Sequence, residues 1–169
     1  MALKKIISKD LISKLSVSAA LIIIGVLAPL IKQQMIAGPI VNACLFIGAA
    51  LLGSGNAVLI GLMPSLIALS IGLLPAVLAP MIPFIMTGNA ILILVFSRLK
   101  EKNYWLAVFL ASIAKFAFLF GASFIVSNLI IKKEIAVKAA SMMSWPQLAT
   151  ALLGAVIAYS IIILRNKYE

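Results

Sequence analysis

A long stretch without acidic or basic residues runs from Gln33 to Ser97, between Lys32 and Arg98. A soluble domain of this size could not bury such a run. A helix needs about 20 apolar residues to cross the hydrocarbon core of a bilayer. The run therefore belongs in a membrane and is long enough for about three crossings.

The overall composition agrees with a membrane protein. Hydrophobic residues make up 64% of the chain, and the mean hydropathy is +1.24, well above the values of soluble domains. A formal net charge of +10 would suggest nucleic acid in a soluble protein, but here the bases lie at the ends and in short connections. Anionic lipid headgroups account for that placement. We expect one transmembrane domain over residues 1–169, in contact with membrane lipid and with no nucleic-acid partner.

Charged residues, glycines and prolines divide the apolar sequence into six segments, which predicts an all-α protein with six transmembrane helices. The basic N-terminus lacks a small-x-small cleavage site and its apolar part continues to Ile31, so we expect an uncleaved first helix. Gly38-Pro39 and residues 53–56 are expected to be turns. The predicted helices cover residues 15–31, 40–54, 57–74, 80–97, 104–131 and 145–164.

Three prolines crowd the connection between the third and fourth segments. Pro75, Pro80 and Pro83 forbid a continuous helix there, because proline lacks the amide donor and clashes with the preceding turn. Irregular backbone at membrane depth is tolerated only where it is buried in protein or lines a cavity. We therefore expect this stretch to lie near a binding site.

An even number of crossings places both termini on the same side of the membrane. The positive-inside rule then puts both termini of this multi-pass membrane protein in the cytoplasm. Nine bases fall on the side of the termini and four on the other: Lys4, Lys5, Lys9, Lys14, Arg98, Lys100, Lys102, Arg165 and Lys167 against Lys32, Lys132, Lys133 and Lys138.

The chain lacks most of the side chains that enzymes and metal sites use. It has no histidine, one cysteine and no phosphate-binding loop of the G-x-x-x-x-G-K-[ST] type. A metal site, a disulfide framework and a thiol–imidazole pair are excluded, and an intramembrane proton relay is hard to build. We expect no catalytic residue, no cofactor and no enzymatic activity. The only acids lie outside the apolar segments: Asp10, Glu101, Glu134 and Glu169.

Lys115 is the one basic residue deep inside an apolar segment, about 16 Å from the start of the fifth helix at 1.5 Å per residue. A lysine there costs at least about 2.5 to 3.5 kcal/mol on insertion scales, so it should face the protein interior and have a partner. An electronegative group of a bound ligand would supply that partner. Alternatively, Lys115 donates to backbone carbonyls freed by the prolines, or is kept uncharged.

Four further side chains complete the predicted substrate-binding set with Lys115. Asn89 follows the proline cluster, Gln147 begins the sixth helix, and Asn42 lies in the second. Amides both donate and accept, which suits a neutral heterocycle, but each also serves as an ordinary packing hydrogen bond between helices. Trp145 could stack on a ligand or anchor the helix at the membrane interface.

Ala57, Gly61 and Ser65 recur at four-residue intervals in the third segment. A stripe of small residues lets helices approach closely. It could serve packing inside the protein or the docking of another subunit.

Several of these features together resemble the substrate-binding S component of energy-coupling factor (ECF) transporters, the bacterial vitamin importers. They are six short helices, basic ends, a glycine- and proline-rich centre, the AKF around Lys115 and the closing SWPQLATALLGAVIAY. The resemblance implies an S-component-like bundle that captures a nutrient outside the cell and associates with a transmembrane coupling (T) subunit and two cytoplasmic ATPases. Members often dock through alanine-x-x-x-alanine in the first helix, where this chain has Ser16 and Ala20.

The hypothesis that follows is a non-enzymatic transport subunit that captures a vitamin or similar micronutrient at the outer face. A second reading is a small structural or assembly subunit of a larger complex, without a ligand of its own, in which Lys115 meets an acid of a partner. A third, a stand-alone proton-coupled carrier, lacks intramembrane acids.

Overall fold

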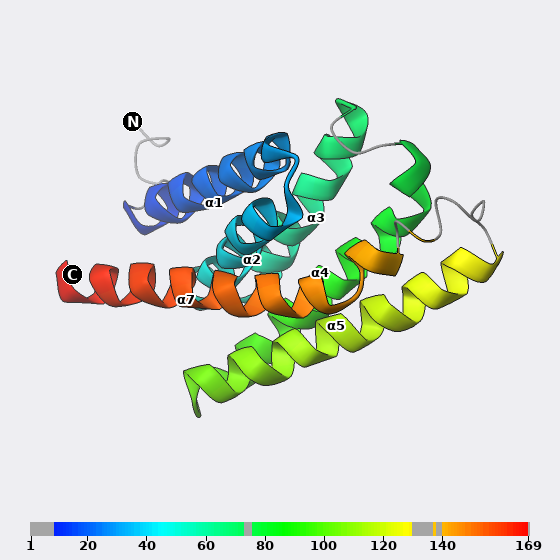
Figure 1. Cartoon of the computed structure of the whole chain (residues 1–169). Coiled ribbons are helices and arrows are strands. Elements are labelled where there is room, and N and C mark those ends of the chain that lie inside the picture. Colours follow the sequence, from blue (N-terminus) through cyan, green and yellow to red (C-terminus); the bar gives the residue numbers. More distant parts are fainter. Residues whose placement is uncertain (1–8, 73–75, 130–136, 138–139, 169) are drawn as a thin grey trace.

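The structure is a computed structural model that describes residues 9–72, 76–129, 137 and 140–168, and it forms a bundle of helices (Figure 1). Among these residues there is no strand, which confirms the predicted all-α class. The elements are α1 (Lys9–Leu27), the 3-10 helix η2 (Ala28–Ile31), α2 (Gln34–Leu51), α3 (Ser54–Ser70), the 3-10 helix η3 (Ala76–Met81), α4 (Ile82–Leu99), α5 (Tyr104–Leu129) and α7 (Trp145–Tyr168).

In the part of the chain that the structure describes, five apolar helices are long enough to cross a membrane, which supports a membrane protein. The segment that was expected to form the third crossing is shorter, because α3 has 17 residues and spans about 25 Å at 1.5 Å per residue. A hydrocarbon core is about 30 Å thick. The predicted end of that helix at residues 73–74 lies outside the described residues, as does Pro75. The five spans cover 11–31, 34–51, 79–99, 104–126 and 140–165.

The expected turn at Gly38-Pro39 is wrong, because α2 continues through both residues. Proline at this position removes one main-chain hydrogen bond, but α2 packs along α7 more extensively than any other two elements pack together. A Cβ on Gly38 would lie 2.7 Å from Cγ2 of Thr150, so the two helices nearly touch at this point. Close interhelical packing outweighs the local preference for a turn.

The predicted break at the prolines is confirmed. α3 ends at Ser70, Pro80 lies in the 3-10 helix η3, and Pro83 occupies the first turn of α4. Proline is tolerated in a first turn because its missing amide would have no intrahelical partner there. Residues 53–56 only partly form the expected turn, since Gly53 has a positive φ of 82° and α3 begins at Ser54.

The core lies between the helices where small and aromatic side chains meet. Phe46 of α2 and Phe96 of α4 are fully buried and make an edge-to-face contact with ring centroids 4.9 Å apart. The stripe of Ala57, Gly61 and Ser65 is buried as well, and a Cβ on Gly61 would lie 3.0 Å from Cδ1 of Ile93 in α4. This burial supports the internal-packing reading of the stripe.

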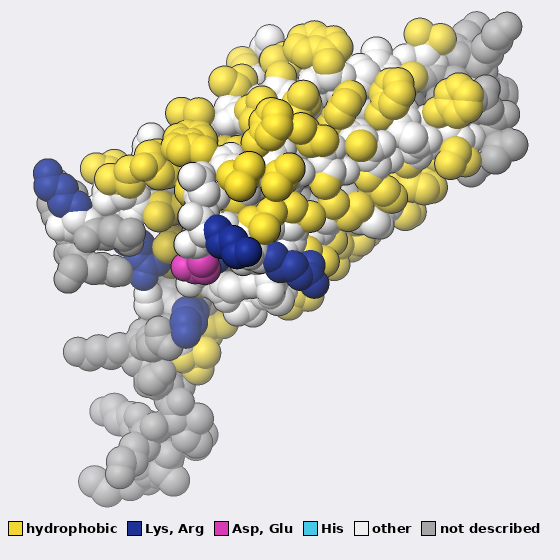
Figure 2. Space-filling view, turned by 90° about the horizontal axis from the view of Figure 1, so that it is seen from below, with side chains coloured by type: hydrophobic (Ala, Val, Ile, Leu, Met, Phe, Trp, Pro, Cys, Tyr) yellow, Lys and Arg dark blue, Asp and Glu magenta, His cyan; other side chains and the backbone are white. Residues whose placement is uncertain are grey.

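The N-terminal end of α1, the C-terminal end of α7 and the connection between α4 and α5 lie at the same end of the bundle (Figure 1). Figure 2 shows Lys and Arg side chains gathered at one end of a face that is otherwise largely hydrophobic. Which side of the membrane this end faces stays a prediction. Five of the bases counted for topology lie outside the described residues: Lys4, Lys5, Lys132, Lys133 and Lys138.

Candidate functional site

Lys115 lies in the middle of α5 and is buried inside the bundle, with 3% of its surface exposed. Its Nζ donates hydrogen bonds to Oδ1 of Asn42 at 2.7 Å and to Oδ1 of Asn89 at 2.8 Å. Both distances fall in the range of charge-assisted hydrogen bonds. The prediction that Lys115 faces the interior and has partners is confirmed, and two of those partners are amide side chains.

The amide nitrogens of the two asparagines hold these oxygens in place. Nδ2 of Asn42 donates to O of Gly38 at 3.0 Å and, more weakly, to Oγ1 of Thr150 at 3.4 Å. Nδ2 of Asn89 donates to O of Gly61 at 2.9 Å. Because each amide nitrogen donates to an oxygen, each amide oxygen is the atom that faces the lysine.

We call Lys115, Asn42, Asn89 and Thr150 the lysine cluster. Its members come from α5, α2, α4 and α7, and the bond from Asn89 to Gly61 extends it to α3. All four side chains are buried. The cluster therefore connects five helices at one buried point.

Glycines allow the helices to come close enough for these contacts. A Cβ on Gly154 of α7 would lie 2.7 Å from both Cβ of Asn42 and O of Pro39, closer than real Cβ atoms approach. A Cβ on Gly61 would lie 3.5 Å from Cβ of Asn89. Small residues at helix crossings in membranes have this effect, since they let the backbones approach.

The negative charge that would normally accompany a buried lysine is absent from the apolar helices. None of the four acids of the sequence lies within the candidate membrane spans or within the apolar part of α3. Amide oxygens carry only partial negative charge, so the cluster solvates an ammonium without neutralising it. The arrangement is therefore suited to an additional electronegative group close to Lys115.

Ser112 adds a second polar group on the same side of α5. It lies three residues before Lys115, a spacing that places two side chains on one helix face. It is fully buried, and its Oγ has no hydrogen-bond partner among the described residues. A buried polar atom without a partner is uncommon in folded proteins. This hydroxyl offers a donor and an acceptor within one turn of the lysine.

In the described structure neither Gln147 nor Trp145, the other two predicted site residues, is hydrogen-bonded to Lys115. Nε2 of Gln147 donates to O of Met142 at 3.1 Å. The main-chain oxygen of Gln147 is what links this residue to the lysine cluster, since it accepts a hydrogen bond from Oγ1 of Thr150 at 3.2 Å. Trp145 is 64% exposed, at the start of α7. Of the five predicted residues, the structure brings Lys115, Asn42 and Asn89 into direct contact.

Sequence reasoning left Thr150 and Ser112 out of the site. Both are hydroxyl residues within apolar helices, where such side chains are common and usually bond to their own helix. The available signal was their spacing, because each lies three positions from a predicted site residue. Ser112 precedes Lys115, and Thr150 follows Gln147.

Among the described residues there is no group of three or more histidines, cysteines or acids that could hold a metal ion. No family model matches this sequence, and no curated protein and no solved structure matches it significantly.

Proposed function

We propose that this protein is a membrane-embedded binding subunit for a small anionic or strongly electronegative nutrient, held at Lys115. The observation that carries the proposal is a buried intramembrane lysine whose partners in the described structure are neutral amides. Ionisable side chains at membrane depth are costly, and they usually mark a functional site.

The chemistry of the cluster supports a ligand with a carboxylate or a polarised carbonyl. The ammonium of Lys115 would bind that group, and the hydroxyl of Ser112 could bond to the same ligand from one turn away. Asn42 and Asn89 act by positioning the lysine, because their own amide nitrogens are occupied by main-chain and threonine oxygens.

The wider proposal is that of an S component of an ECF importer, with six crossings, cytoplasmic termini and capture at the outer face of a bacterial plasma membrane. In this proposal the T subunit and two ATPases supply the energy for uptake. The features that support it are five long apolar helices, the shorter apolar helix α3 and the basic end shared by the two chain ends.

The test is mass spectrometry of small molecules released from the detergent-purified protein after exposure to a vitamin mixture. The parent is compared with Lys115→Ala and with Phe96→Leu, a control that weakens the core away from the cluster. We expect one compound retained by the parent and by Phe96→Leu, and at least about fivefold less in Lys115→Ala, the loss of roughly 1 kcal/mol of hydrogen bonding. Equal retention by all three proteins would refute the site.

A second candidate function is an assembly subunit without a ligand. The observation that favours it is that Asn42 and Asn89 already provide Lys115 with two hydrogen bonds inside the chain. In this case no compound is retained by any variant, and a membrane partner co-purifies with the protein whether or not Lys115, which is buried inside the chain, is replaced. Native mass spectrometry of the complex extracted in mild detergent distinguishes the two functions.

A further inference from the structure

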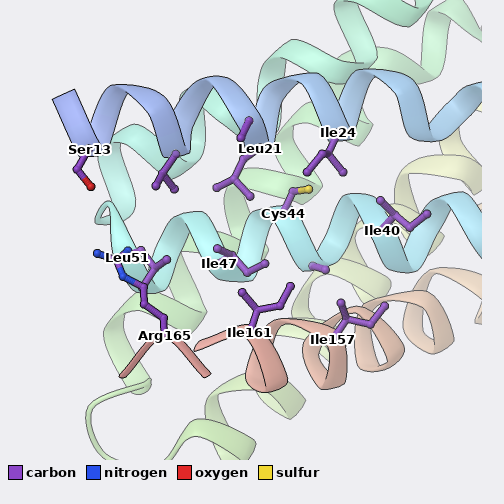
Figure 3. A pocket seen from close by; sticks show the side chains of 13 residues that line it. Ser13, Leu21, Ile24, Ile40, Cys44, Ile47, Leu51, Ile157, Ile161 and Arg165 are labelled. Atoms are coloured by element: carbon purple, nitrogen blue, oxygen red, sulfur yellow. The ribbon is translucent and has the colours of Figure 1, made fainter. Parts of the chain in front are cut away.

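A groove of about 520 Å³ runs along the outside of the bundle, and none of its lining residues belongs to the lysine cluster. Its walls are α1 and α7 and its floor is α2 (Figure 3). The side chains of Leu21 and Ile24 point into it from α1, and those of Ile157 and Ile161 point into it from α7. The volume is in the range of small-molecule sites, and the lining is almost entirely aliphatic.

The groove exists because α1 touches the rest of the bundle along a narrow line. Among the α1 residues whose burial the structure describes, Leu21 and Gly25 alone are buried. A Cβ on Gly25 would lie 3.0 Å from Cγ of Pro64, so α1 rests on α3 at this point. Because α1 leans on α3, a channel stays open between α1 and α7.

The groove is about as long as the hydrocarbon part of one membrane leaflet is thick. From Ser13 to Ile24, which mark its two ends on α1, the helix rises about 16 Å at 1.5 Å per residue. Half of a hydrocarbon core of roughly 30 Å is about 15 Å. An acyl chain that entered at the Ser13 end would therefore finish near the middle of the bilayer.

A basic residue lies at one end of the groove. Arg165 lines the groove beside Leu51 and Ser13, at the end where α1 begins and α7 finishes (Figure 3). Arg165 also interacts within the protein, but its guanidinium has five N–H donors in a fork that matches the oxygens of a phosphate, so it can bind one in addition. The opposite end of the groove, near Ile24 and Ile40, is apolar.

We propose that this groove binds one anionic phospholipid, with an acyl chain between α1 and α7 and the phosphate at Arg165. The gathering of basic side chains at one end of the molecule favours an anionic headgroup over a zwitterionic one (Figure 2). The occupant is part of the membrane itself, so the proposal is independent of any nutrient bound at Lys115.

The experiment uses the full chain in phosphatidylcholine vesicles with a trace of phosphatidylglycerol that carries a photoreactive diazirine in its acyl chain. After illumination, peptide mass spectrometry locates the labelled residues. We expect labelling to concentrate on the groove faces of α1, α2 and α7. Photoreactive phosphatidylcholine at the same mole fraction should label this groove at least about fivefold less, since one basic residue near the surface changes lipid binding by about that factor.

Two matched pairs of variants test the geometry and the charge. Ala20 is exposed and lines the groove, whereas its exposed neighbour Ala19 does not, so Ala20→Phe should abolish labelling and Ala19→Phe should preserve it. Arg165→Gln should remove most of the preference for phosphatidylglycerol. Lys167→Gln, which removes the same charge from the same helix end outside the groove, should keep it.

Three results would overturn the proposal. One is labelling spread evenly over lipid-facing helices such as α5, and another is an equal response to Arg165→Gln and Lys167→Gln. The third is that groove residues carry no lipid label and are cross-linked instead to a helix of another subunit or of a second copy, which would make the groove a protein interface.

Discussion

The hydrogen bond between Lys115 and Asn89 should contribute measurably to stability, and its energy can be isolated in a double-mutant cycle. The two changes are Lys115→Met and Asn89→Leu, which replace polar side chains by apolar ones of similar size. Asn89→Leu alone leaves the buried ammonium with one fewer acceptor. In the Lys115→Met background the same change removes an amide that no longer faces a charge.

The expected coupling energy follows from the geometry. Hydrogen bonds between helices in membranes contribute about 0.6 kcal/mol on average and up to about 1.7 kcal/mol, and bonds to charged groups in proteins contribute about 1.5 to 3 kcal/mol. The 2.8 Å distance and the 3% exposure of Lys115 place this pair at the upper end for membranes. We expect a coupling of about 1.5 kcal/mol, roughly a tenfold change in the unfolding equilibrium.

The measurement is the unfolding equilibrium of the four proteins in mixed micelles, followed by circular dichroism. Asn56→Leu serves as the control, because Asn56 is exposed and its Nδ2 donates to O of Leu52 one turn earlier in the chain. Its effect should add to that of Lys115→Met. A coupling below about 0.5 kcal/mol for the Lys115–Asn89 pair would mean that the lysine cluster does not hold the helices together.

Two further predictions concern contacts of α7. Gly154→Ala should lower the free energy of unfolding by about 1 to 3 kcal/mol, because the new Cβ would meet α2 backbone atoms and force the helices apart. The control is Gly121→Ala in α5, which should be neutral or stabilising because its Cβ would have nothing within 4 Å. Equal melting temperatures of the two variants would contradict the close packing of α2 and α7. Tyr104→Phe should lower the free energy of unfolding by about 1 kcal/mol, because it removes the 2.8 Å hydrogen bond to O of Ala155. Tyr104→Leu should lower it further, because it also removes the aromatic contacts of the ring. Thermal unfolding in detergent measures both variants, and equal losses would show that the aromatic contacts do not stabilise the protein.

The helical class and the starts of two helices could be predicted from the sequence, because they depend on local signals. The fifth helix was expected from residue 104 and the sixth from residue 145, and α5 and α7 begin at those positions. Charged or aromatic residues mark both starts, and Pro146 suits a first turn. The same local logic failed at Pro39, where the decisive contact comes from α7, more than a hundred residues later in the chain.

The candidate site was only partly predictable for the same reason. The cost of a charge in a membrane was enough to place Lys115 in the interior, and the scarcity of polar residues was enough to select Asn42 and Asn89. Their direct contact with the lysine depends on how three helices, α2, α4 and α5, cross, which no single segment encodes. Gln147 carries the same amide group, yet its amide nitrogen donates to the main-chain oxygen of Met142, before α7 begins.

The close pairing of α2 with α7 also affects how the protein must be made. Asn42 and Thr150, which meet in the finished bundle, are 108 positions apart. At the usual rate of synthesis of about 5 to 20 residues per second, Asn42 is made roughly 5 to 20 s before Thr150. Until α7 is made, α2 lacks the neighbour that covers its polar face, so the packing around Asn42 is complete only after α7 has left the ribosome.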